Sequence, residues 1–148
     1  MTKSKPASEQ FNKGLNCSQS IIAKYADKYN LDVAIACKLA TGFGGGMGRQ
    51  GNTCGALTGA YLVLGLEYGS SSPDEKHKKE LTYDKIRDFT KQFEQKHQCT
   101  NCRDLLGCDV GTNEGQKIAK ENNLHETRCS LFVDDATHLL DKIIQSDE

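Results

Sequence analysis

The sequence predicts an all-α fold, a compact multi-helix bundle formed by a single domain. Several segments repeat apolar residues every three or four positions, which places those residues on one face of a helix. No segment alternates apolar and polar residues as a half-buried strand does, and no internal repeat is present. With 148 residues, of which 36% are hydrophobic, the chain can bury one core without cross-links. We therefore expect one helical domain over residues 1–148, with residues 1–7 disordered.

The N-terminal third predicts two helices. The first is expected to be one long helix, because a stripe of residues recurs at intervals of four and three, with Cys17 beside it. This stripe consists of Phe11, Leu15, Ser18, Ile22, Tyr25 and Tyr29. A short second helix should begin after Asp32, a residue type that caps helices, and run through Ala40 into a glycine-rich segment.

The segment from Thr41 to Gly69 holds ten of the fourteen glycines, with Cys54 in its middle. Glycine tolerates positive φ, so such a loop can turn backbone N–H groups toward an anionic sulfur or a cluster. A third helix is predicted from Asn52 or Thr53, which places Cys54 near its positive end, where a thiolate is stabilised. We therefore expect Cys54 to react first among the thiols. The candidate cofactor-binding residues are Gly44, Gly45, Gly46, Gly48 and Gly55.

The C-terminal half predicts three further helices. The break at residues 70–74 opens a strongly charged helix whose buried stripe is Ile86, Phe89 and Phe93. A small helix is expected around residues 114–122. The last helix buries the stripe Cys129, Phe132, Val133, Ala136, Leu140 and Ile143. We expect the stripes of the first, third and last helices to form the core, with the loop GFGGGMG lying over a cysteine site.

Charge and hydropathy exclude several classes of partner. The net charge of −1 indicates neither a nucleic-acid footprint nor a membrane-surface patch. The N-terminus lacks the apolar segment of an export signal, and the longest apolar stretch, residues 56–66, is about half of what a bilayer requires. We expect a cytoplasmic protein that folds alone or as a homodimer. The sequence does not identify a redox partner protein or a small substrate.

Seven cysteines in a chain without an export signal argue against a disulfide framework and favour metal ligation or redox chemistry. The pair Cys99 and Cys102 forms a CxxC, but the βαβ context of a thioredoxin is missing. Residues 46–51 spell GxGxxG, yet they follow a helix instead of the strand that a dinucleotide site requires. The histidines are expected at the surface, and only His97, close to Cys99, is kept as a candidate ligand.

Four cysteine motifs in a fixed order carry a resemblance to a known family. Cys17 lies in NCSQS, Cys54 opens CGALTG behind the GGGMG loop, Cys102 begins CRDLLG, and Cys129 follows near the end. With these motifs the chain resembles the C_GCAxxG_C_C family of redox-active proteins over nearly its whole length after the first ten residues. The resemblance implies a compact helical domain related to a domain of the split-Soret cytochromes, in which an iron–sulfur cluster is associated with such cysteines. It also implies that Cys17, Cys54, Cys102 and Cys129 are the metal ligands.

The residues by themselves leave three functions open. The first is an iron–sulfur protein, either [2Fe–2S] or [4Fe–4S], that transfers electrons, because four Cys thiolates commonly hold such clusters and glycine N–H groups can hydrogen-bond their sulfurs. The second is a dithiol/disulfide protein in which Cys54 exchanges with a neighbouring cysteine. The third is a structural zinc site, held by four cysteines, that only keeps the helices together. Cys37 and Cys108 are expected to be small buried residues with no ligand role.

Overall fold

The computed structural model describes residues 6–147 and is all-helical in that part of the chain, apart from one isolated β-bridge. The helices are α1 (Ala7–Asn12), α2 (Cys17–Tyr25), α3 (Val33–Ala40), α4 (Gly44–Met47), α5 (Gly55–Tyr68), α6 (Lys76–His97), α7 (Cys102–Leu106), α8 (Asn113–Glu121) and α9 (Ser130–Ser146). Three short turns complete the described helical structure: the 3-10 turns η1 (Ala26–Tyr29) and η2 (Thr41–Phe43), and the π turn η3 (His125–Cys129).

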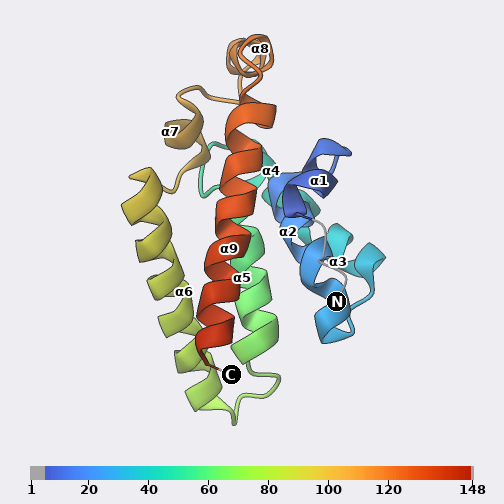
Figure 1. The fold of residues 1–148 in the computed structure, drawn as a ribbon, viewed down its shortest axis with the longest axis vertical. Helices are drawn as coiled ribbons and strands as arrows, with labels where there is room; N and C mark the ends of the chain where they lie inside the picture. The colour runs from blue at the N-terminus through green and yellow to red at the C-terminus, as the bar shows by residue number, and fades with distance from the viewer. Residues whose placement is uncertain (1–5, 148) are drawn as a thin grey trace.

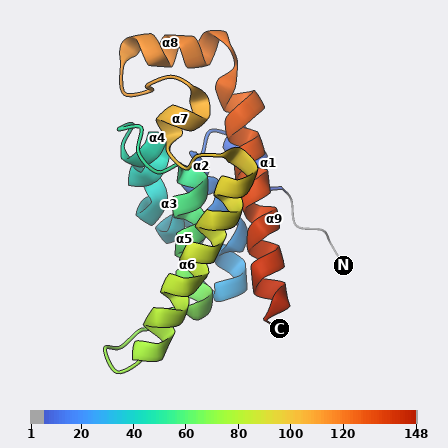
Figure 2. The ribbon, with the colours of Figure 1, turned by 90° about the vertical axis from the view of Figure 1, so that its left-hand side faces the viewer.

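The long helices α5, α6 and α9 run side by side, and the N-terminal helices pack against one side of this group (Figure 1). The core is formed where α2, α5 and α9 meet, as the apolar stripes predict, and α6 adds Phe89 and Phe93 to it. Helix α8 lies across one end of the bundle with α7 beneath it, and the C-terminus lies at the opposite end (Figure 2). The end beneath α8 is therefore closed by short elements and loops.

The expectation of one long N-terminal helix is wrong. The segment is divided into α1, α2 and the turn η1, with a connection around Gly14, whose φ of +111° ends any regular helix. A new helix then begins because Asn16 and Gln19 form a reciprocal capping box. The apolar residues keep their helical spacing on both sides of this connection, so the periodicity did not reveal the end of α1. Residues 1–5 lie outside the described part, so their expected disorder stays a prediction, whereas Ala7 is fully buried and begins α1.

Most of the other predicted helices are confirmed. Asp32 caps α3 by accepting a hydrogen bond from the Ile35 N–H, and α8 and α9 begin and end close to the expected positions. The predicted stripe of the last helix is buried throughout. Helix α7 was not predicted, because its five residues are too short to show a period. No helix in residues 6–147 is long and apolar enough to cross a bilayer.

The glycine-rich loop forms a left-handed turn, although it is labelled α4. Five consecutive residues from Gly45 to Arg49 have φ between +64° and +71°. Two of these, Met47 and Arg49, are not glycine, and each carries a cost of about 1 kcal/mol in this conformation. Backbone hydrogen bonds hold the turn closed, with Arg49 N–H donating to Gly44 and Gly51 N–H donating to Gly45. The loop is therefore an ordered turn, and its closely spaced glycines make the left-handed conformation accessible.

Candidate cysteine site

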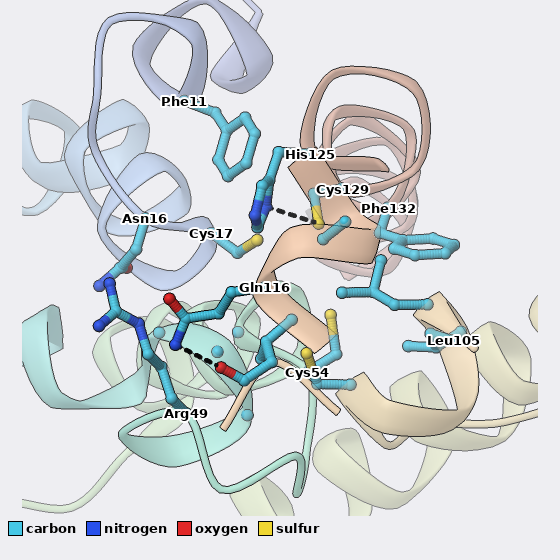
Figure 3. A pocket seen from close by; sticks show the side chains of 18 of the residues that line it. Phe11, Asn16, Cys17, Arg49, Cys54, Leu105, Gln116, His125, Cys129 and Phe132 are labelled. Atoms are coloured by element: carbon cyan, nitrogen blue, oxygen red, sulfur yellow. Dashed lines mark hydrogen bonds between the residues drawn. The ribbon is translucent and has the colours of Figure 1, made fainter. Parts of the chain in front are cut away.

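A cavity of about 980 Å³ lies at the end of the bundle beneath α8. Cys17, Cys54, Cys102 and Cys129 all line it, and each is buried, with 5–9% of its surface exposed. All four are free thiols. The side chains of Cys17, Cys54 and Cys129 lie around the cavity in Figure 3, on three different elements. The fold thus gathers residues that lie up to 112 positions apart in sequence onto one cavity.

Three of these cysteines stand at helix starts. Cys17 is the first residue of α2, Cys54 is the N-cap of α5, and Cys102 is the first residue of α7. The first N–H groups of a helix have no partner within the helix and carry partial positive charge, which stabilises an anion placed there. The side chains at the caps of α5 and α7 do not take up these N–H groups. The prediction that Cys54 lies at a helix N-terminus is confirmed, and the same arrangement at Cys17 and Cys102 was not foreseen.

Two backbone segments are paired to bring the second and third cysteines together. Thr53 and Asn101 form an antiparallel bridge, in which Cys54 N–H donates to the Thr100 carbonyl at 2.8 Å and Cys102 N–H donates to the Asn52 carbonyl at 2.7 Å. Alternate residues of such a pair share one face. The bridge therefore fixes the starts of α5 and α7 beside each other, with both cysteines turned to the cavity.

The five candidate glycines, Gly44, Gly45, Gly46, Gly48 and Gly55, all line the cavity. A Cβ at Gly46 would lie 2.7 Å from the Cys102 Cβ, and one at Gly55 would lie 2.9 Å from the Cys17 Cβ. Contacts this short do not occur, so only glycine lets the backbone approach these two cysteines. Gly59, one turn after Gly55, packs in the same way on Ser18, so this face of the helix also serves helix packing.

The thiols at one side of the cavity influence one another's ionisation. The neighbouring sulfurs of Cys129 and Cys54, together with burial, raise the pKa of Cys17 well above its ordinary value. The Cys17 thiol lowers the pKa of Cys129, and His125, whose Nδ1 lies 3.7 Å from the Cys129 sulfur, lowers it further. In return, the Cys129 sulfur raises the pKa of His125. Cys129 is therefore a thiolate candidate that the sequence did not reveal.

Burial dominates at Cys102, where it raises the pKa of the thiol to about 12. The three remaining cysteines do not line the cavity. Cys108 is buried as expected, but Cys37 is only half-buried, so the prediction of a buried side chain there is wrong. Cys99 is also half-buried and its thiol donates to the His97 carbonyl at 3.6 Å.

Three of the four histidines, His77, His125 and His138, are exposed, as expected. His97, the candidate ligand, does not line the cavity; its Nε2 lies 2.9 Å from Asp135 and its ring packs on Phe93 and Phe132. It is half-buried against the bundle. His125, which the sequence placed with the surface histidines, is exposed but borders the cavity beside Cys129. A signal was present in the sequence, since His125 precedes Cys129 by four positions, the spacing of helical neighbours.

The model of a family described as "Putative redox-active protein (C_GCAxxG_C_C)" matches residues 15–143. The chain belongs to this family. The match includes α2 to α8 and most of α9, and with them all four cysteines of the cavity. Neither a curated protein nor a solved structure matches the chain.

The four cysteines that the resemblance assigns to the family pattern, Cys17, Cys54, Cys102 and Cys129, all line the cavity, whereas Cys37, Cys99 and Cys108 do not. Within residues 6–147, no group of three or more His, Cys, Asp or Glu side chains is close enough to hold a single metal ion. In an iron–sulfur cluster the cysteines bind to different iron atoms, so the ligand sulfurs lie farther apart than they do around a single ion. Four buried thiols around an open cavity, with helix N-termini directed to them, fit such a group.

Proposed function

We propose that this protein binds an iron–sulfur cluster through Cys17, Cys54, Cys102 and Cys129 and transfers electrons. The observation that carries the proposal is that four free, buried thiols from separate elements line one cavity, while the other three cysteines do not. Thiolate ligation by four cysteines is the usual way in which proteins hold such clusters. Membership in a family described as redox-active supports the same conclusion.

The chain contributes charge stabilisation and enclosure to this site. The helix starts at Cys17, Cys54 and Cys102 favour negative charge on the sulfurs, and the left-handed loop from Gly45 to Arg49 brings backbone close to them. When bound, an iron–sulfur cluster would supply a one-electron carrier whose potential responds to these hydrogen bonds and to burial. The open mouth of the cavity would allow electrons to be exchanged with a partner that docks there.

A dithiol/disulfide protein is the second candidate, and one observation favours it. Cys17 and Cys129 line the same cavity and shift each other's pKa in opposite directions, and His125 supports ionisation of Cys129, as in sites where a thiolate attacks. Oxidation of this pair would form one S–S bond and pass two electrons and two protons to an oxidant. A structural zinc site receives less support, because no three ligands of the described residues gather around a single point.

Anaerobic purification followed by iron, sulfide and zinc assays and by electron paramagnetic resonance tests these candidates. We expect iron and acid-labile sulfide in the purified protein, and a paramagnetic signal in one oxidation state. Stoichiometric zinc without sulfide would establish the structural site instead. A metal-free protein that gains and loses one disulfide reversibly would establish the dithiol function.

Single Cys→Ser variants test the ligand assignment. We expect Cys54→Ser and Cys102→Ser to lose bound iron, and Cys37→Ser and Cys108→Ser to keep it, because only the first two line the cavity. The second pair serves as the matched control. If Cys37→Ser removed iron as completely as Cys54→Ser, the assignment of the ligands would be wrong.

A further inference from the structure

The cavity is larger than four thiols and a metal group require, and its lining is divided by chemistry. At one side lie the cysteines; at the other, Arg49 extends along the wall toward Asn16, with Gln116 beside it (Figure 3). A volume of about 980 Å³ is at the upper end of the range for small-molecule sites. The part beyond the thiols is therefore available to a ligand.

Positive charge predominates in this second part. Arg49 from the left-handed loop and Lys117 and Lys120 from α8 line the cavity, against one carboxylate, that of Glu126. Within the part of the chain that the structure describes, neither Arg49 nor Lys120 has an ion-pair partner, and Lys117 has only a long contact of 3.9 Å to Glu121. These cations are therefore free to bind a negatively charged ligand at the mouth of the cavity.

The loop holds the backbone of Arg49 in a strained, left-handed conformation. Its φ of +64° is one that side chains other than glycine seldom adopt, yet glycine precedes it in the chain and follows it two positions later. The loop packs closely around it, since a Cβ at Gly45 would lie 2.7 Å from the Arg49 Cγ. The stem of the Arg49 side chain thus packs against the loop at the cavity wall, and the planar fork of its guanidinium suits a carboxylate.

The remaining walls are apolar. Phe11, Leu105, Leu106, Val110, Ala119 and Phe132 also line the cavity, with Phe11, Leu105 and Phe132 around the cysteines in Figure 3. A ligand that bridges the two parts needs a negatively charged group for Arg49 and a carbon body for these walls. We propose that the cavity binds a small organic carboxylate, with its carboxylate at Arg49, Lys117 and Lys120 and its body directed to the thiols. The inference rests on the proposed function in one respect only, which is that the ligand would lie beside a bound metal group.

Equilibrium dialysis of the anaerobically purified full chain with radiolabelled benzoate tests this site, with neutral benzamide as the isostere. We expect saturable binding of benzoate at millimolar concentration or below and at least tenfold weaker binding of benzamide. Arg49→Gly should weaken benzoate binding at least about tenfold, because the charge-assisted hydrogen bonds between the guanidinium and the carboxylate are lost. Glycine suits the left-handed φ at this position, so the variant should fold.

Lys91→Gln on α6 removes a cation that does not line the cavity, and should bind benzoate as the unmodified protein does. Equal binding of benzamide, or undiminished binding by Arg49→Gly, would overturn the proposal, as would no binding of benzoate. Displacement by inorganic phosphate as effective as by unlabelled benzoate would overturn the assignment to an organic anion. Iron is assayed in the same samples and reports separately on the proposed function. Protein that binds benzoate but contains no iron would contradict the iron–sulfur function and leave the carboxylate site supported.

Discussion

At the scale of single residues, Cys129 owes its properties to two neighbours. The neighbouring thiol of Cys17 and the imidazole of His125, whose Nδ1 lies 3.7 Å from the Cys129 sulfur, together lower its pKa against the opposing effect of burial. Cys102 lies in the same cavity without such partners, and burial raises its pKa. Two cysteines of one site therefore differ in reactivity because of what donates to each sulfur.

Alkylation of the metal-free, reduced protein should reveal this difference. At pH 7 we expect Cys129 to react faster than Cys102, with a rate profile that inflects below the value of about 8.5 typical of a free thiol. Peptide mapping by mass spectrometry after timed exposure to iodoacetamide measures all seven rates at once. The same map tests the sequence-based expectation that Cys54 reacts first. Equal rates at Cys129 and Cys102 would contradict the hydrogen-bonding argument.

His125→Gln should slow alkylation of Cys129 at pH 7. A hydrogen bond to a charged group contributes roughly 1.5–3 kcal/mol when buried, but His125 is exposed, so we expect only about threefold. His138→Gln, which changes an exposed histidine of α9, is the matched control and should leave the rate unchanged. An effect of the same size in both variants would indicate a general change in charge.

Two buried serines of α2 should respond in opposite ways to alanine. The Ser18 hydroxyl is fully buried and has no hydrogen-bond partner among the described residues, whereas the Ser20 hydroxyl donates to the Asn16 carbonyl at 2.7 Å. Ser18→Ala should leave the free energy of unfolding unchanged or raise it by up to about 1 kcal/mol. Ser20→Ala should lower it by about 1 kcal/mol. Urea unfolding followed by circular dichroism measures both, and a larger loss for Ser18→Ala would mean that its hydroxyl is bonded.

At the scale of elements, α5 is the helix on which the site depends. Its first turn carries Cys54 and Gly55, and its glycine face lets α2 approach closely enough to bring Cys17 to the same cavity. The sequence shows Gly55 and Gly59 four positions apart but could not show which helix would approach them. The sequence did not identify α2 as the packing partner of α5. The apolar stripe of α2 continues across the turn that separates it from α1, so the two helices looked like one.

Alanine substitutions on α5 test this interface. In Gly59→Ala the new Cβ would lie 2.9 Å from the Ser18 carbonyl oxygen, so the helices must separate, and we expect a loss of about 1–3 kcal/mol. Gly65→Ala meets no atom within 4 Å and should stabilise the helix by about 0.5–1 kcal/mol. Thermal and urea unfolding of the two variants gives the comparison. Equal effects would show that α2 does not pack on this face.

At the scale of the whole molecule, the cavity is the place where short elements from distant parts of the sequence meet. Four cysteines arrive from α2, α5, α7 and η3, and short loops surround them, while the long helices form the core farther down the bundle. A group bound to all four would connect these elements. The same site would then contribute to stability as well as to electron transfer.

Removal of bound iron should therefore lower the thermal midpoint. A ligand at 100 times its Kd stabilises a protein by about 2.7 kcal/mol, which corresponds to roughly 5–10 °C for a chain of this size. Anaerobic calorimetry before and after chelation measures the change, and Cys108→Ser should show the same difference as the unmodified protein. A midpoint that does not respond to chelation would mean that the bound group does not connect the elements.

The sequence by itself determined the helical class, the buried stripe of α9, the cap of α3 and the family pattern of cysteines, because periodicity, capping and spacing are local properties. Only the tertiary structure decided what lies beside each cysteine. The bridge between Thr53 and Asn101 and the position of Arg49 in the cavity join residues through folding. Such contacts depend on how helices pack, and no local pattern specifies them.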